Sequence, residues 1–102
     1  MKLALLAAAA VIVATPAFAD CQSDAQLQAQ KVRAATQTLQ EQSNAPMAEQ
    51  CRTGMGLIAE AKRLNTIRQN CQAELQLTAQ DLQQADQRIQ AADQEYAARC
   101  GG

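Results

Sequence analysis

Four cysteines are the residues of this chain best suited to chemistry: Cys21, Cys51, Cys71 and Cys100. Paired thiols form structural disulfides, bind metals or exchange electrons with other thiol pairs. The intervals between them are 30, 20 and 29 residues, whereas redox-active and zinc-binding pairs are usually separated by about two to four residues. An even number of widely spaced cysteines therefore predicts two structural disulfides.

The remaining side chains offer little for catalysis. The chain has no histidine, which excludes nucleophile–His catalysis and imidazole metal sites. Asp81 and Asp86 do not have the three- or four-residue spacing that places two carboxylates on one helix face. We therefore expect no enzyme activity, no cofactor and no metal site. A thiol–disulfide redox role for Cys51 and Cys100 would require a bridge that is readily reduced.

The first 19 residues have the pattern of a cleaved signal peptide. Lys2 supplies a positive charge, residues 3–14 are apolar, and the small residues Ala17 and Ala19 stand where a signal peptidase needs them. The apolar stretch is short for a transmembrane helix, and a short, Ala-rich signal is typical of bacteria. We expect cleavage after Ala19 and a single domain over residues 20–102. Its destination would be the periplasm or the exterior, where disulfides persist.

Residues 20–102 contain only fourteen large apolar side chains, beside fifteen Ala and seventeen Gln. A core this small is marginal, so the two disulfides, at about 2–4 kcal/mol each, are expected to be required for folding. The net charge of these residues is −2, from eight Lys and Arg and ten Asp and Glu, with both signs interspersed. This composition argues against nucleic-acid binding and against stable membrane insertion after cleavage of the signal.

Helix-forming residues dominate the chain after the signal. The pattern predicts a first helix over about residues 23–43, where Ser23 and Gln26 have the spacing of a capping box. The segment Ser43–Pro46 predicts a turn, because Pro46 disfavours helix at the residue before it and is acceptable in the first turn of a new helix. A second helix, continuous or broken, is predicted over about residues 46–99.

One heptad repeat can be written from Met47 to Arg99, which is typical of coiled-coil-like packing. Its weak positions are Gly54, near which a kink is expected because each glycine costs about 1 kcal/mol of helix propensity, and Arg68, whose stem is expected to pack while its head reaches water. The core positions of the repeat are Met47, Gly54, Leu57, Ala61, Leu64, Arg68, Cys71, Leu75, Thr78, Leu82, Ala85, Ile89, Ala92, Tyr96 and Arg99.

The cysteine positions rank the disulfide pairings. In an antiparallel hairpin, bridged residues lie equally far from the turn, and the midpoint of Cys21 and Cys71 is Pro46 itself. This favours Cys21–Cys71 and leaves Cys51 for Cys100, whose midpoint falls next to Leu75. If the chain reverses there, one chain forms a closed three-helix bundle with two internal bridges, which is the form we favour. If the helix continues, two chains form a swapped antiparallel dimer.

The predicted fold is therefore all-α, an antiparallel helical hairpin or three-helix bundle stapled by two disulfides. The function that we favour for this chain is that of a non-enzymatic periplasmic interaction or scaffold module, which presents a Gln-rich face to another envelope protein. The alternative is a small periplasmic chaperone or inhibitor that binds clients through an apolar patch. The candidate patch consists of Met47, Met55, Leu57 and Ile58.

Overall fold

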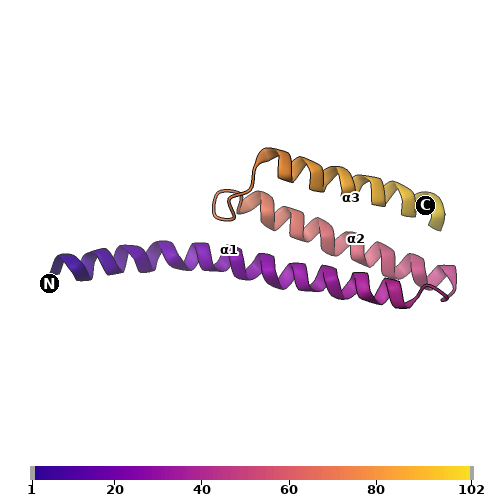
Figure 1. The fold of residues 1–102 in the computed structure, drawn as a ribbon, viewed down its shortest axis with the longest axis horizontal. Coiled ribbons are helices and arrows are strands. Elements are labelled where there is room, and N and C mark those ends of the chain that lie inside the picture. Colours follow the sequence, from indigo (N-terminus) through magenta and orange to yellow (C-terminus); the bar gives the residue numbers. More distant parts are fainter. Residues whose placement is uncertain (1, 102) are drawn as a thin grey trace.

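Three antiparallel α-helices make up the computed structural model of this chain (Figure 1). The structure describes residues 2–101, and their side chains from residue 20 onward. The helices are α1 (Lys2–Glu41), α2 (Met47–Asn70) and α3 (Ala79–Cys100). The all-α class predicted from the sequence is confirmed. The cleavage point after Ala19 falls inside α1 and stays a prediction, as does a helix start at Ser23 in the cleaved chain.

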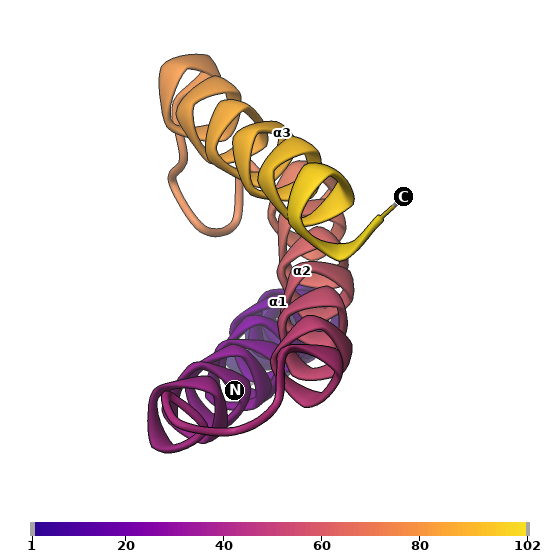
Figure 2. The same ribbon diagram turned by 90° about the vertical axis from the view of Figure 1, so that its right-hand side faces the viewer.

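The central helix of the fold is α2, because it packs against both α1 and α3. Within the described residues, no Cα atom of α1 comes within 8 Å of a Cα atom of α3. Viewed along the long axis in Figure 2, the three helices form an open arc with α2 in the middle. The bundle therefore has two helix–helix seams rather than the three of a closed bundle.

Each outer helix contributes one line of half-buried side chains to its seam. The lines follow helical spacing and, in α3, coincide with the predicted heptad positions. In α1 they are Ala25, Ala29, Val32, Ala35 and Leu39, and in α3 they are Leu82, Ala85, Ile89, Ala92 and Tyr96. The hydrophobic side chains that are buried are Cys51, Ile58 and Cys71, and no described side chain is fully buried. The core is thin, as the composition predicts.

The turn between α1 and α2 lies where Ser43 and Pro46 predict a break. Pro46 is the N-cap of α2 with φ −56° and ψ 149°. The side chain of Gln50 reaches back and donates to the carbonyl oxygens of Ser43 and Ala45, at 3.2 and 2.8 Å. These bonds satisfy two backbone acceptors of the turn that would otherwise depend on water.

The chain reverses again between Cys71 and Thr78. The helix predicted over about residues 46–99 is therefore broken into α2 and α3 rather than continuous. Gln76 adopts the left-handed conformation, with φ 55°, and the N–H of Leu77 donates to the carbonyl of Gln72 at 2.9 Å. Helix α3 then starts with a capping box. Thr78 Oγ1 accepts from the Asp81 N–H, and the Asp81 carboxylate accepts from the Thr78 N–H.

Two disulfides tie the outer helices to α2, and the predicted pairing is confirmed. Cys21–Cys71 joins α1 to the end of α2, and Cys51–Cys100 joins the start of α2 to the end of α3. The Cα–Cα distances are 5.8 and 5.9 Å, within the usual range for disulfides. Each bridge closes a helical hairpin at the end opposite its turn.

The two glycines of α2 differ in what surrounds them. The helix continues without a break through Gly54 and Gly56, where the sequence favours a kink. Gly54 is buried, and a Cβ atom there would overlap the Tyr96 ring and lie 2.7 Å from its hydroxyl oxygen. A Cβ at Gly56 would have nothing within 4 Å. Gly54 thus lets the aromatic ring of α3 approach the backbone of α2.

We predict opposite effects for alanine at these two positions. Gly56→Ala should raise the free energy of unfolding by up to about 1 kcal/mol, since alanine has the higher helix propensity. Gly54→Ala should lower it by about 1–2 kcal/mol, because displacing Tyr96 costs more than the propensity gain. Urea unfolding followed by circular dichroism measures both. If both variants were more stable than the parent chain, the packing of Tyr96 on Gly54 would be contradicted.

We also predict that each disulfide protects the outer helix that it ties. Replacing Cys51 and Cys100 by Ser should cost about 2–5 kcal/mol and increase amide exchange most in α3. Replacing Cys21 and Cys71 by Ser should have its largest effect in α1 instead. Hydrogen exchange with mass spectrometry reads the two helices separately. Equal loss of protection in both helices for both variants would contradict the two-seam arrangement.

Candidate binding surface

A stripe along α2 lies between its two seams and is covered by neither outer helix completely. Leu57, Ala61, Leu64 and Arg68 follow one another at intervals of four, three and four residues, so they share one helix face. All four are half-buried. We call them the central stripe. In a closed three-helix bundle these heptad positions would point to the bundle axis, but here α1 and α3 do not meet over them.

Two hollows flank the central stripe, and together with it they form what we call the groove. The first hollow, about 320 Å³, lies beside α1 and the 71–78 loop. The second, about 210 Å³, lies between α2 and α3. The first is lined by Ala25, Gln26, Ala29, Arg33, Leu64, Arg68, Leu75 and Leu77, and the second by Leu57, Ile58, Ala61, Arg88, Ile89, Ala92 and Tyr96.

The charged residues that line the groove are all arginines, although the chain has a net charge of −1. Arg33 and Arg88 are exposed and Arg68 is half-buried. None of the three forms an ion pair with another side chain of residues 20–101. The groove therefore combines alkyl walls with guanidinium groups whose hydrogen-bond donors are available to a partner.

One carboxylate influences the groove from its edge. The pKa of Asp81 is lowered from 3.8, mainly by the hydrogen bond from the Thr78 backbone N–H, then by the Thr78 side chain and by the positive charge of Arg68. Asp81 is exposed and does not line either hollow. It therefore offsets only part of the positive charge of Arg68.

The side of α2 away from the central stripe is polar. Lys62 pairs with Asp93 of α3 at 3.1 Å, and both side chains are more than half exposed. A hollow of about 390 Å³ beside this pair is lined by Lys62, Asp86, Asp93 and mostly uncharged polar residues. One of these is Asn65, which is buried and whose Oδ1 has no hydrogen-bond partner within the described residues. The groove side of α2 is thus lined by alkyl groups and arginines, whereas this hollow on its other side is lined mainly by polar residues of both charges.

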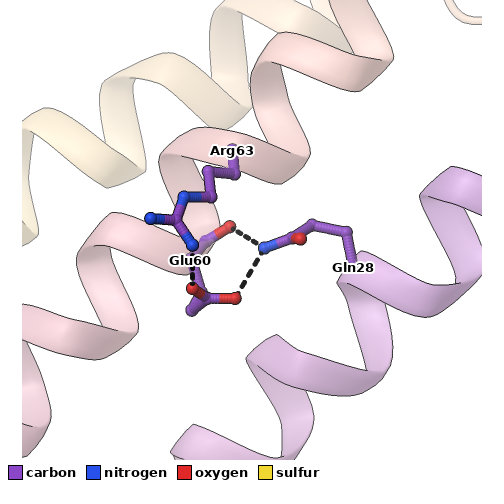
Figure 3. Close-up of polar contacts among 3 residues, drawn as sticks. All are labelled: Gln28, Glu60 and Arg63. Atoms are coloured by element: carbon purple, nitrogen blue, oxygen red, sulfur yellow. Dashed lines mark hydrogen bonds and ion pairs between the residues drawn. The ribbon is translucent and has the colours of Figure 1, made fainter.

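A buried glutamine sets the position of α1 against α2 (Figure 3). Gln28 of α1 is 7 % exposed, and its Nε2 donates to both the carbonyl oxygen and the Oε2 of Glu60, each at 2.9 Å. Arg63 holds the other oxygen of that carboxylate at 2.7 Å. Because these bonds join the two helices in one register, they also place the α1 wall of the groove.

Two ion pairs join residues three or four positions apart within one helix. They are Glu60–Arg63 in α2 and Glu95–Arg99 in α3. Arg99 also lies over the Tyr96 ring, 5.4 Å from its centroid. Since the paired side chains are mostly exposed, these contacts contribute little to stability.

The structure separates the four residues of the predicted apolar patch. Ile58 is buried and Leu57 is half-buried, and both line the second hollow. Met47 and Met55 are more than half exposed and line neither hollow. Residues two positions apart, such as Met55 and Leu57, face different directions on a helix. The groove instead takes Leu64, Leu75 and Leu77, which the heptad repeat and the 71–78 segment supply.

All four cysteines are in disulfides. The Glu74 carboxylate lies 3.7 Å from Cys21 Sγ, and with Cys71 these groups form a cluster of metal-ligand type. Both sulfurs are in the disulfide, so they carry no proton to donate and supply no thiolate for a metal. The contact between Glu74 and Cys21 is therefore a packing contact beside the bridge.

Comparison with protein-family models, with curated proteins and with solved structures finds no match for this chain. In the part of the chain that the structure describes, no helix has a segment with the length and apolar character needed to cross a bilayer. The groove and the disulfides are therefore the structural features that bear on function.

We predict that the Thr78 hydroxyl lowers the Asp81 pKa and stabilises the start of α3. Thr78→Ala should raise that pKa towards 3.8 and cost about 1 kcal/mol of stability. Because the Asp81 pKa is lowered in the folded protein, its contribution to stability is present above pH 3.8 and is lost as the pH falls through the lowered value. NMR titration of the side-chain carboxyl carbons measures the pKa.

Thr66→Ala is the matched control, because the Thr66 hydroxyl donates to the Lys62 carbonyl within α2. This variant should leave the Asp81 pKa unchanged. An equal pKa in the Thr78→Ala variant and the parent chain would contradict the role of the capping box.

Proposed function

We propose that this chain is an exported, non-enzymatic interaction protein of the bacterial envelope that binds another protein through the groove. The observation that carries the proposal is the central stripe of α2, whose side chains occupy core positions of a helical bundle without a third seam to cover them. Apolar surface left in water costs about 25 cal/mol per Å². A partner that covers this stripe gains that free energy.

The disulfides and the signal pattern support the exported location. Structural disulfides persist in oxidising compartments, and both bridges join helices that have few other means of staying together. The pattern of residues 1–19 supplies a route to such a compartment. An envelope protein that is exposed to variable conditions benefits from covalent ties that do not depend on a large core.

The chemistry of the groove supports binding rather than catalysis. Its walls are alkyl side chains, one phenol ring, an amide and three guanidinium groups. Guanidinium and alkyl groups orient and hold a partner, whereas covalent and acid–base catalysis need a nucleophile or a group that titrates near neutral pH.

A second candidate function is a small chaperone that binds unfolded clients. Among residues 20–101, three large apolar side chains are more than half exposed, Leu27, Met47 and Met55, and flexible methionines suit surfaces that accept many partners. These residues do not line the groove. A chaperone would therefore use a different surface from an interaction module.

We predict that a photo-crosslinking residue at Gln26, exposed at the rim of the first hollow, captures one defined protein in cells that export the chain. The same residue at Ala59, exposed on α2 and outside both hollows, should capture far less of it. The measurement is the number and identity of crosslinked products in the exported fraction. Equal capture at Gln26 and Ala59 would contradict the proposal. If the crosslinking residue is placed at Met55 and only that position captures many different proteins, the chaperone function would be favoured.

A further inference from the structure

We infer that the groove binds a single amphipathic α-helix of a partner protein, with acidic side chains beside its apolar stripe, which lies along α2 between α1 and α3. This inference rests on the proposed interaction function and names the chemistry of the partner. It follows from the shape of the groove, from its apolar walls and from its charge.

The arrangement of the three helices fits a fourth. Since α1 and α3 both contact α2 but not each other, a helix placed over the central stripe would contact all three and complete an arrangement like a four-helix bundle. The stripe from Leu57 to Arg68 extends about 17 Å at 1.5 Å per residue. A partner helix of about twelve to sixteen residues would cover it.

The apolar walls match the contacts that a helix makes in a groove. An amphipathic helix inserts side chains at intervals of three and four residues. The two hollows lie on either side of the same stripe, one beside Leu64 and one beside Leu57. They would receive successive apolar side chains of the partner.

The charge of the groove selects the occupant. Arg33 and Arg68 line the first hollow and Arg88 lines the second, and none is paired with an acidic side chain of residues 20–101. Asp81 lies close enough to Arg68 to have its pKa lowered, but its carboxylate is engaged by Thr78. Glu or Asp beside the partner's apolar stripe would form charge-assisted hydrogen bonds with these arginines.

The same charges disfavour a second copy of this chain. A two-fold dimer through the groove would place the arginines of one chain against those of the other, and the lining of both hollows contains no acidic residue to relieve the repulsion. An acidic helix from a different protein meets no such penalty.

The test uses the oxidised chain over residues 20–102 and two synthetic peptides of about sixteen residues. Both carry Leu at intervals of three and four residues, one with Glu at the flanking positions and the other with Lys. We expect the Glu peptide to bind with one-to-one stoichiometry and at least tenfold more tightly than the Lys peptide. The double variant Arg33→Glu with Arg88→Glu should reverse this preference.

Arg52→Glu is the matched control, because Arg52 is exposed, unpaired among the described side chains and outside the groove. It should leave the preference for the Glu peptide intact. Hydrogen exchange should show new protection in residues 57–68 of α2. A circular-dichroism spectrum of each variant checks that it remains folded, and the reversed preference of the double variant would itself show a folded groove.

Four outcomes would overturn the inference: equal affinity for both peptides, no change in the double variant, protection outside the groove, or tighter binding to phosphatidylglycerol vesicles than to the Glu peptide. If one of these occurs while Gln26 still crosslinks a defined protein, the class of partner is wrong and the interaction role stands. If the Gln26 crosslink itself is absent, the interaction role is wrong.

Discussion

Two covalent bridges hold the outer helices to α2 in a small protein whose described residues bury little apolar surface. Among the side chains of residues 20–101, three hydrophobic ones are buried, and two of them, Cys51 and Cys71, are themselves in the disulfides. Each bridge fixes one outer helix to α2 at the end remote from its turn. Everything else, including the depth of the groove, depends on α2 being held from both ends.

Because α2 packs against both α1 and α3, its surface has three lines of residues, one facing each of these helices and one between them. One line of residues faces α1, where Gln28 and Glu60 set the register, and another faces α3, where Gly54 admits the Tyr96 ring. The central stripe lies between these lines. The side chains of Leu57 and Leu64 on this stripe are half-buried and line the two hollows of the groove.

Much of the fold could be predicted from the sequence, because hairpin geometry and helical spacing depend on residue positions alone. The midpoint at Pro46 predicted Cys21–Cys71, and the bridge is present. The second reversal was harder to predict because Gln76, rather than a glycine or proline, adopts its left-handed conformation. The spacing of Thr78 and Asp81 is a capping box that marks the start of α3. The groove could not be predicted, since a heptad repeat specifies which positions are apolar and not whether α1 and α3 meet over them.

Arg68 gives a physical reason for the central stripe to be left uncovered by α1 and α3. A charged side chain at a core position of a closed bundle would lose its hydration, which is costly without a partner. In the open arrangement Arg68 is half-buried, lines the first hollow and lies close enough to Asp81 to help lower the pKa of that carboxyl. The same residue disfavours closure of α1 onto α3. In the complex that we propose, it would meet an acidic side chain of the partner, so the charge within the stripe agrees with a bundle completed by another helix rather than one that closes on itself.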